Sequence, residues 1–258
     1  MPNAVLQINN LTLGYRAHPA VHHLTGTLAP GSLTALVGAN GSGKSTLMKG
    51  IAGLLKPITG SITIQPGTRL AYLPQQSELD RSFPVQVQDL VALGLWSKRG
   101  IFKRYQPEDK VIIRTALEAV GLQGFEKRSL DTLSGGQFQR VLFARVLVQD
   151  ADLILLDEPF NAIDMNTLET LLNLIQQWHQ EGRSVVVVVH NLDIVRQVFP
   201  ETLLLARELI AWGPTKEVLT AANIARLRQQ PQGWQADAPW CPVNELPGGR
   251  AGSVVHGR

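Results

Sequence analysis

The sequence of 258 residues contains one cysteine, Cys241, so it has no pair from which to build an internal disulfide or a zinc site of several cysteines. It also lacks any apolar run near the roughly 18 to 20 residues that a membrane-spanning helix needs, since runs such as residues 153–156 and 185–189 are far shorter. The N-terminus has no basic segment followed by an apolar one, so no secretory signal is expected. These absences together predict a globular protein of the reducing cytosol.

Charge of one sign is not concentrated anywhere in the chain. The formal net charge is +3, and Lys and Arg are dispersed without a run of like charge, so no nucleic-acid surface and no nucleic-acid partner are expected. The sequence pI of about 9.2 would permit contact with an anionic membrane face. Five residues that could suggest a metal sensor have spacings that match no site geometry and are interpreted as solvated surface: His18, His22, His23, Cys241 and His256.

Hydrophobic periodicity predicts an α/β domain with a parallel sheet. Alternation over residues 5–15 indicates strands, and the short apolar runs at residues 33–37, 153–156 and 185–189 are typical of buried strands. Helical spacing follows residue 46 and returns over residues 134–147 and 168–178. Further β structure is expected at residues 61–64 and 69–73.

The chain divides into two predicted parts. Residues 1–230 form the domain, and apolar residues at helical spacing between about 89 and 120 predict a helical insert that spans about residues 77–148. Residues 231–258 are rich in Pro and Gly and have no periodicity, which predicts a weakly ordered tail or a wrapping extension.

A glycine-rich loop stands between a predicted strand and a predicted helix and fits the pattern G-x-x-x-x-G-K-[ST]. Glycines let the backbone N–H groups turn inward around phosphates, the lysine supplies a full positive charge, and the hydroxyl can ligate Mg²⁺. The alternative, a glycine-rich turn that happens to precede a lysine, is disfavoured by the flanking strand and helix. Taken alone, the loop predicts only that a nucleoside triphosphate is bound, since GTPases, kinases and helicases use the same loop. The sequence has no Asn-Lys-x-Asp motif of the kind that reads guanine in GTPases. The loop's expected nucleotide-binding residues are Gly38, Ala39, Asn40, Gly41, Ser42, Gly43, Lys44, Ser45 and Thr46.

A second motif, LSGGQ, occupies residues 133–137 directly before a predicted helix. Taken alone, Ser134 could be an ordinary helix N-cap, which is compatible with a phosphate-binding role. With this motif the sequence resembles the ATP-binding subunits of ABC transporters from about residue 6 to residue 219. The resemblance implies a P-loop NTPase core of RecA-like type with an antiparallel β subdomain and a helical insert specific to ABC proteins. The resemblance implies that Ser134, Gly135, Gly136 and Gln137 contact the γ-phosphate of an ATP held by the opposite subunit.

The resemblance also assigns the acids after residues 153–156 and a histidine further on. Asp157 would hold Mg²⁺, directly or through water, and Glu158 would polarise the attacking water as general base, although carboxylates at a strand end could also simply face solvent. Asp164 lies in a segment, FNAID, that resembles the loop crossing the dimer interface, with Asn161 where Ser is commoner. His190 matches the family's switch histidine, although a lone histidine there is more often structural.

Two further assignments rest on the same resemblance. Gln75 matches the glutamine that reaches Mg²⁺ and water, and the adjacent Gln76 leaves open an assignment one residue away. Tyr15 matches the aromatic residue that stacks on adenine, with a plain core tyrosine as the alternative. The expected metal ligands are therefore Ser45, Gln75 and Asp157, and the expected catalytic residues are Glu158, His190 and Gln75.

The function implied by the resemblance is ATP hydrolysis coupled to translocation, with ATP and Mg²⁺ as cofactors. It further implies a homodimer peripheral to the cytoplasmic face of the membrane, bound to polytopic permease subunits that receive a metal from an extracytoplasmic binding protein. Residues 74–94, 158–164 and 203–220 look like the branch of zinc and manganese importers, and subunits for ferric chelates are close in pattern. One alternative function is that of an ABC ATPase of DNA repair or chromosome maintenance. Such proteins generally carry long coiled-coil or zinc-bearing inserts, and this sequence has neither the heptads nor the paired cysteines that would indicate one. The other alternative is a module that uses ATP only to dimerise.

Overall fold

The computed structural model describes residues 4–15, 18–78, 84–96, 106–161 and 163–229. Within them a six-stranded sheet has the order β5-β6-β7-β3-β8-β9, and a three-stranded sheet has the order β2-β1-β4. The larger sheet is parallel except for β9, which pairs antiparallel with β8. Its strands are β3 Leu33–Val37, β5 Leu70–Leu73, β6 Leu153–Leu156, β7 Ser184–Val188, β8 Glu201–Ala206 and β9 Glu208–Pro214.

The central strands are apolar throughout because both faces of the larger sheet are covered. Alternate residues point to opposite faces, so Ile154 and Leu156 enter one hydrophobic cluster while Leu153 and Leu155 enter the other. The first cluster packs against α5 Gly135–Gln149 and α6 Met165–Gln180, and the second packs against α1 Lys44–Ile51 and the smaller sheet. The predicted α/β class with a parallel sheet is confirmed.

The smaller sheet is the predicted antiparallel β subdomain. β1 Leu6–Tyr15 pairs antiparallel with both β2 His18–Leu28 and β4 Thr59–Ile64. β2 is absent from the sequence prediction, because its pairing with β1 shifts register at three places and so breaks the period-2 pattern that would indicate a strand.

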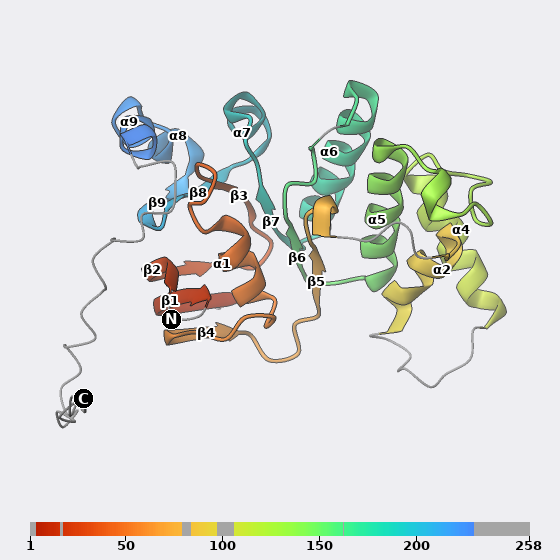
Figure 1. Ribbon diagram of the computed structural model, residues 1–258, viewed down its shortest axis with the longest axis horizontal. Helices are drawn as coiled ribbons and strands as arrows, with labels where there is room; N and C mark the ends of the chain where they lie inside the picture. Colours follow the sequence, from red (N-terminus) through yellow and green to blue (C-terminus); the bar gives the residue numbers. More distant parts are fainter. Residues whose placement is uncertain (1–3, 16–17, 79–83, 97–105, 162, 230–258) are drawn as a thin grey trace, which may run out of the picture.

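Helices α2 Val87–Ala92 and α4 Pro107–Ala119 lie at one end of the molecule beside α5 (Figure 1). This helical group lies between β5 and β6 in the chain, where the helical insert was expected. The remaining helices are α7 Leu192–Val198, α8 Thr215–Val218 and α9 Ala221–Gln229, with 3₁₀ turns η1 Gln76–Glu78, η2 Leu93–Leu95 and η3 Leu130–Thr132.

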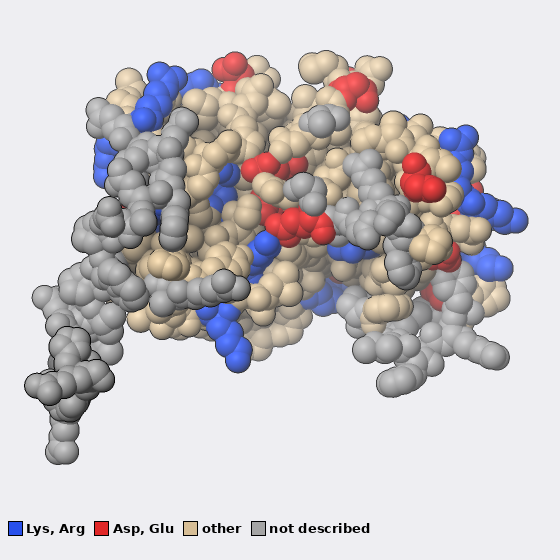
Figure 2. All heavy atoms as spheres, in the orientation of Figure 1, with Lys and Arg blue, Asp and Glu red and all other residues tan. Residues whose placement is uncertain are grey.

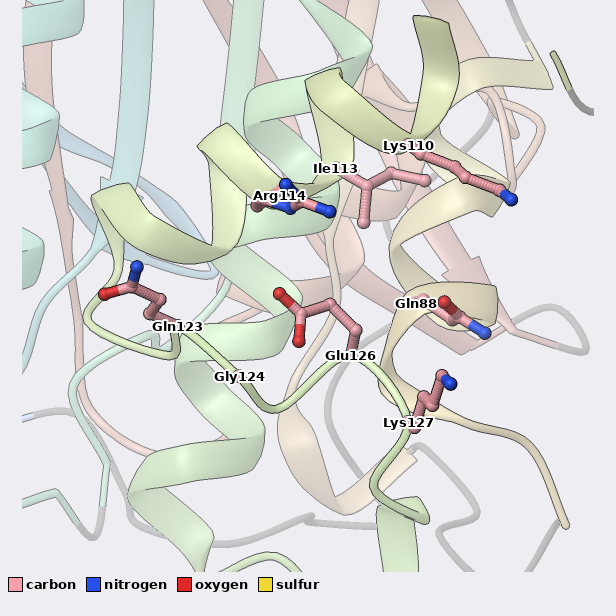
Figure 3. Close-up of a pocket in the computed structure, with 8 residues that line it drawn as sticks. All are labelled: Gln88, Lys110, Ile113, Arg114, Gln123, Gly124, Glu126 and Lys127. Carbon is pink, nitrogen blue, oxygen red and sulfur yellow. The ribbon is translucent and has the colours of Figure 1, made fainter. Parts of the chain in front are cut away.

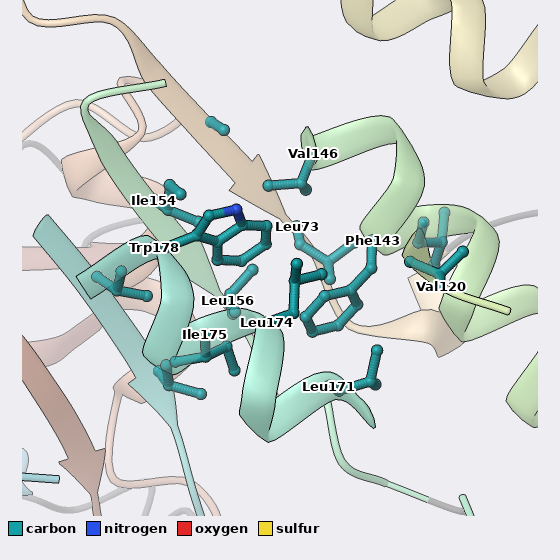
Figure 4. Packing of buried hydrophobic residues seen from close by; sticks show 14 of the residues in the cluster. Leu73, Val120, Phe143, Val146, Ile154, Leu156, Leu171, Leu174, Ile175 and Trp178 are labelled. Carbon is teal, nitrogen blue, oxygen red and sulfur yellow. The ribbon is translucent and has the colours of Figure 1, made fainter. Parts of the chain in front are cut away.

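Two α-helices, α5 and α6, are locked together by their aromatic residues. Trp178 of α6 and Phe143 of α5 stack with ring centroids 5.9 Å apart and planes 5° from parallel (Figure 4). Both side chains are fully buried. Since α5 and α6 each begin beside a predicted site motif, this contact fixes how the two motifs lie relative to each other.

Among the described helices, none combines the length and the apolar character needed to cross a bilayer. Lys and Arg side chains are spread over several places on the face shown in Figure 2. The predicted tail, residues 231–258, lies outside the described residues.

Candidate functional site

The glycine-rich loop connects the end of β3 to the start of α1, as predicted. Gly43 is the residue before the helix and has φ +93°, and Gly41 has φ +77°, both in the left-handed region that favours glycine. The loop borders an open cavity of about 440 Å³. The described residues that line this cavity are Ala20, Asn40, Gly41, Gly43, Lys44, Ser45, Thr46, Gln75 and Glu158.

Close packing explains two of the loop's glycines. A Cβ at Gly43 would lie 2.5 Å from the carbonyl oxygen of Ala20, and one at Gly38 would lie 2.4 Å from the carbonyl oxygen of Leu205. At Gly41 a Cβ would meet nothing within 4 Å. The loop is therefore held against β2 and β8 and open on the side of the cavity.

Lys44 is 5% exposed and supplies the positive charge of the loop. Its Nζ donates hydrogen bonds to the carbonyl oxygens of Gly38 at 3.0 Å and Ala39 at 2.9 Å. Burial lowers the pKa of Lys44, and the nearby carboxylates of Glu158 and Asp157 oppose that shift. A phosphate in the cavity would offer this cation a stronger, charge-assisted partner than two carbonyl groups.

Asp157 follows β6 and is 1% exposed. Neither of its carboxylate oxygens has a hydrogen-bond partner among the described residues. Burial raises the pKa of Asp157 to about 6, and the Ser45 hydroxyl opposes this shift. Burying a carboxylate is costly unless it is paired, and a hard divalent cation held by Asp157 would offset that cost.

The residues around Asp157 fit Mg²⁺. Ser45, the second residue of α1, lines the cavity with a hydroxyl, and Gln75 lines it with a side-chain amide from the segment after β5. A carboxylate, a hydroxyl and an amide oxygen are the ligand types that Mg²⁺ takes beside phosphate and water. Of the three predicted metal ligands, Ser45 and Gln75 line the same cavity, and the Ser45 hydroxyl is near enough to the Asp157 carboxyl to affect its pKa.

Glu158 and His190 meet at the carboxyl ends of β6 and β7. His190 Nε2 lies 2.8 Å from Glu158 Oε1, and Asn161 donates a hydrogen bond from Nδ2 to Glu158 Oε2. The Glu158 side chain is 14% exposed, and its backbone has φ +50°, which is uncommon for a non-glycine residue. The carboxylate is thus oriented by two partners while remaining on the cavity wall.

The LSGGQ segment forms the start of α5. Ser134 is the N-cap, its Oγ accepts from the backbone N–H of Gln137 at 3.2 Å, and Gln137 Oε1 accepts from the N–H of Ser134 at 3.0 Å. None of the described residues that line the cavity comes from this segment. Of the two predicted phosphate-binding motifs, the glycine-rich loop therefore borders the cavity and the LSGGQ segment of the same chain does not.

Asp164 is the N-cap of α6 and accepts hydrogen bonds from the N–H and the hydroxyl of Thr167. It lies beside the LSGGQ segment, since a Cβ at Gly136 would be 3.5 Å from Asp164 Oδ2. Tyr15 ends β1, is 50% exposed and is absent from the cavity lining, so it is a surface tyrosine and not a core one.

Several contacts at the site have no signal in the sequence pattern. Ala20 lines the cavity from β2, a strand that the prediction lacks. Asn161 orients Glu158, and Gln76 donates from Nε2 to the carbonyl oxygen of Gly135 at 2.9 Å.

The histidines near the N-terminus differ in their exposure to solvent. His18 and His23 are exposed, whereas His22 is partly buried and its pKa is lowered, chiefly by that burial. Cys241 and His256 lie outside the described residues. A second cavity, of about 550 Å³, lies in the helical group (Figure 3) and is lined by Gln88, Lys110, Ile113, Arg114, Gln123, Gly124, Glu126 and Lys127.

Comparison with known proteins gives a consistent picture. The pattern of the family described as ABC transporter matches residues 21–161. The manganese transport system ATP-binding protein MntB of Listeria monocytogenes is 40% identical over 225 residues, covering 85% of this chain and 94% of that protein. The chelated iron transport system membrane protein YfeB of Yersinia pestis is 37% identical over 228 residues, covering 85% and 77%.

The solved structures agree with the fold. An ABC transporter of proposed metal-chelate type, in an inward-facing conformation, matches with a TM-score of 0.79 and 31% identity over 88% of this chain and 89% of that one. A nucleotide-free ATP-binding cassette of an ABC transporter matches with a TM-score of 0.74 and 22% identity, covering 88% and 99%. The predicted P-loop NTPase fold with its antiparallel subdomain and helical insert is confirmed.

Proposed function

The chain belongs to the ABC transporter family as an ATP-binding subunit whose ATPase activity is coupled to transport, and on that premise we propose that it energises import of a divalent metal ion, manganese or zinc. The ion would pass through a separate polytopic membrane subunit, and a metal-binding protein outside the membrane would deliver it. This subunit would sit peripherally on the cytoplasmic face.

One observation carries the proposal for the working unit: the cavity that holds the glycine-rich loop contains no residue of the LSGGQ segment among its described lining. Both segments present backbone N–H groups at a helix N-terminus, which is an arrangement suited to phosphate. Two chains in opposite orientation would place the loop of one against the LSGGQ segment of the other. We propose a homodimer that holds two ATP molecules in this way.

Each chain's residues would then divide the chemistry. The loop N–H groups and Lys44 would bind the phosphates, and Asp157 with Ser45 and Gln75 would hold Mg²⁺, which neutralises charge on the phosphates when bound. Glu158, oriented by His190, would accept the proton of the attacking water. The Ser134–Gln137 segment of the opposite chain would complete the charge stabilisation of the γ-phosphate.

Motion would follow from assembling and separating these half-sites. ATP between the two chains would favour the closed dimer, and loss of the γ-phosphate would release it. The helical insert, about residues 77–148, would carry this movement to the membrane subunit. The exposed apolar side chains of α4 in this insert, Val111 and Ile112, are suited to that contact.

Manganese is proposed because of the relatives, and zinc because residues 74–94, 158–164 and 203–220 resemble the branch of zinc and manganese importers. The Listeria protein named for manganese transport shares 40% identity over most of both chains. Ferric chelates are the second candidate, because the Yersinia relative is named for chelated iron and is 37% identical. The cargo would not touch this chain in either case.

Metal uptake by cells that carry Lys44→Ala in place of the natural chain tests the substrate. We expect accumulation of manganese or zinc to fall, with iron unchanged, when each metal is supplied alone at limiting concentration. A fall in iron alone would select the chelate alternative. Unchanged accumulation of all three metals would remove both candidates.

Hydrolysis itself is tested with the purified full-length chain and its membrane partner. Phosphate release should depend on Glu158 and be lost in Glu158→Gln. A parent chain as inactive as this variant would support a module that only dimerises on ATP. Recovery of the chain from cells with DNA, and without a polytopic membrane protein, would contradict the transport assignment.

A further inference from the structure

Two neighbouring glutamines make different contacts. Gln75 lines the cavity of the glycine-rich loop. Gln76 turns away from that lining, and its Nε2 donates a hydrogen bond of 2.9 Å to the carbonyl oxygen of Gly135. Gly135 is the first residue of α5 and part of the LSGGQ segment.

The same short 3₁₀ turn, η1, also holds the helix of the glycine-rich loop. Lys49, in the last turn of α1, makes an ion pair of 2.7 Å with Glu78. The hydrogen bond to Glu78 is the main cause that raises the pKa of Lys49. η1 therefore connects to α1 through Glu78 and to α5 through Gln76, within three residues of chain.

The Lys49–Glu78 ion pair and the hydrogen bond from Gln76 to Gly135 differ in exposure to solvent. The Lys49–Glu78 pair has side chains that are 25% and 37% exposed, so solvent screens it and its net energy is small. The hydrogen bond from Gln76 is partly buried, and its acceptor is a backbone carbonyl in the first turn of α5. Because a hydrogen bond is directional, it can fix the position of that backbone group. Gly135 has no side chain through which its position could otherwise be held.

The LSGGQ segment is thus held in place from three sides. Ser134 and Gln137 cap each other within the segment. Gly136 packs beside Asp164 at the start of α6. Gln76 is the contact that comes from the segment that follows β5, next to the residue that lines the ATP cavity.

We propose that Gln76 is a positioning residue for the LSGGQ half-site, and that η1 sets the placement of this half-site relative to the glycine-rich loop of the same chain. Gln75 acts on the ATP bound to its own chain, whereas Gln76 acts through Gly135 on the ATP bound to the partner. This inference rests on the dimer proposed above. It assigns the adjacent glutamines to two different ATP molecules.

Separate measurement of two equilibria tests the assignment. The full-length chain carries Glu158→Gln so that bound ATP persists, and Gln76→Glu is added because glutamate keeps the side chain's length but has no N–H to donate. We expect binding of a fluorescent ATP analogue by the monomer at low protein concentration to stay within about twofold. Because the change removes a hydrogen bond and places a negative charge beside a carbonyl oxygen, ATP-driven dimerisation measured by sedimentation should weaken by at least about three- to tenfold for each half-site.

Two matched variants separate positioning from general damage. Gln76→Lys restores a donor of sufficient reach and should recover dimerisation to within about twofold of the Glu158→Gln parent. Gln75→Ala should show the opposite pattern, with weaker Mg²⁺-ATP binding by the monomer. Circular dichroism and the unfolding midpoint confirm that each chain is folded.

The outcomes distinguish this inference from the proposed function. If the Glu158→Gln parent fails to dimerise on ATP, the dimer and the inference both fall. If the parent dimerises and Gln76→Glu dimerises equally well, only the inference is overturned. Loss of dimerisation that Gln76→Lys does not recover would also overturn it, since the effect would not depend on a donor.

Discussion

His190 Nε2 lies 2.8 Å from Glu158 Oε1, which joins the ends of two neighbouring parallel strands through their side chains. Asn161 donates to the other carboxylate oxygen. A general base needs a defined direction as well as a suitable proton affinity, and these two partners provide the direction. The arrangement makes Glu158 the residue whose replacement should separate binding from hydrolysis.

Glu158→Gln should reduce the rate of ATP hydrolysis by about 10²- to 10⁴-fold, because the amide has the carboxylate's shape without its capacity to accept a proton. ATP affinity should remain close to that of the parent. Phosphate release and equilibrium binding of ATP are the two measurements. Glu181→Gln is a suitable control, since Glu181 follows α6 and pairs with Arg183 away from the cavity. Hydrolysis by Glu158→Gln at the parental rate would exclude Glu158 as the base.

Two glycines of the glycine-rich loop, Gly41 and Gly43, have similar backbone conformations but different packing. Gly41 and Gly43 both have positive φ, but only at Gly43 would a Cβ meet a backbone atom, the carbonyl oxygen of Ala20 at 2.5 Å. Gly41→Ala should cost about 1 kcal/mol of unfolding free energy from strain alone. Gly43→Ala should cost several times more, because the loop must move away from β2. Urea unfolding of the ligand-free chain measures both, and equal losses would contradict the packing argument.

The sequence predicts the parts of the site that depend on local pattern. The loop from Gly38 to Ser45 is recognisable because its glycines, lysine and serine follow a fixed spacing between a strand and a helix. The apolar strand before Asp157 is recognisable because it is buried on both faces. These features need no knowledge of distant residues. Their placement between strand and helix follows from the same local pattern.

Contacts between distant segments could not be predicted in this way. Gln76 and Gly135 are 59 residues apart, and neither has a neighbouring pattern that indicates the other. β2 was not predicted, because register shifts in its pairing with β1 interrupt the alternation of apolar and polar residues. Without β2, the close approach of Ala20 to the glycine-rich loop could not be predicted either. Side-chain hydrogen bonds across the fold depend on the packing of whole helices, which a single sequence does not display.

The stack of Trp178 on Phe143 predicts a large stability effect outside the cavity. Trp178 is 1% exposed, so Trp178→Ala should leave a cavity between α5 and α6 and cost about 3–5 kcal/mol of unfolding free energy. Trp178→Phe should cost clearly less, because an aromatic ring still covers Phe143. Met165→Ala on the same helix is the control: Met165 is 77% exposed, and the change should stay within about 0.5 kcal/mol. A cost below about 1 kcal/mol for Trp178→Ala would contradict the packing seen here.

Asp157 gives a prediction whose sign depends on pH and on the metal. Burial raises the pKa of its carboxyl to about 6, against about 3.9 in an unfolded chain. Below about pH 4 the group is protonated in both states and has no effect on stability. As the pH rises through this interval the unfolded chain releases the proton first, so the folded state loses stability until about pH 6 and then levels off.

Asp157→Asn removes that penalty, so in chelator and without ATP it should stabilise the chain by on the order of 1–3 kcal/mol at about pH 7.5 and by little at about pH 4. Mg²⁺ with ATP should reverse the order, because the parent's carboxylate would help to hold the cation and the neutral amide of the variant would hold it less well. Urea unfolding at the two pH values, with and without Mg²⁺-ATP, measures the four free energies for each chain. Asp193→Asn, whose side chain is 83% exposed, should show neither the gain nor the reversal. If Asp157→Asn were equally destabilising under all four conditions, its carboxylate would have a structural partner in the fold and would not be the free, buried ligand that its geometry indicates.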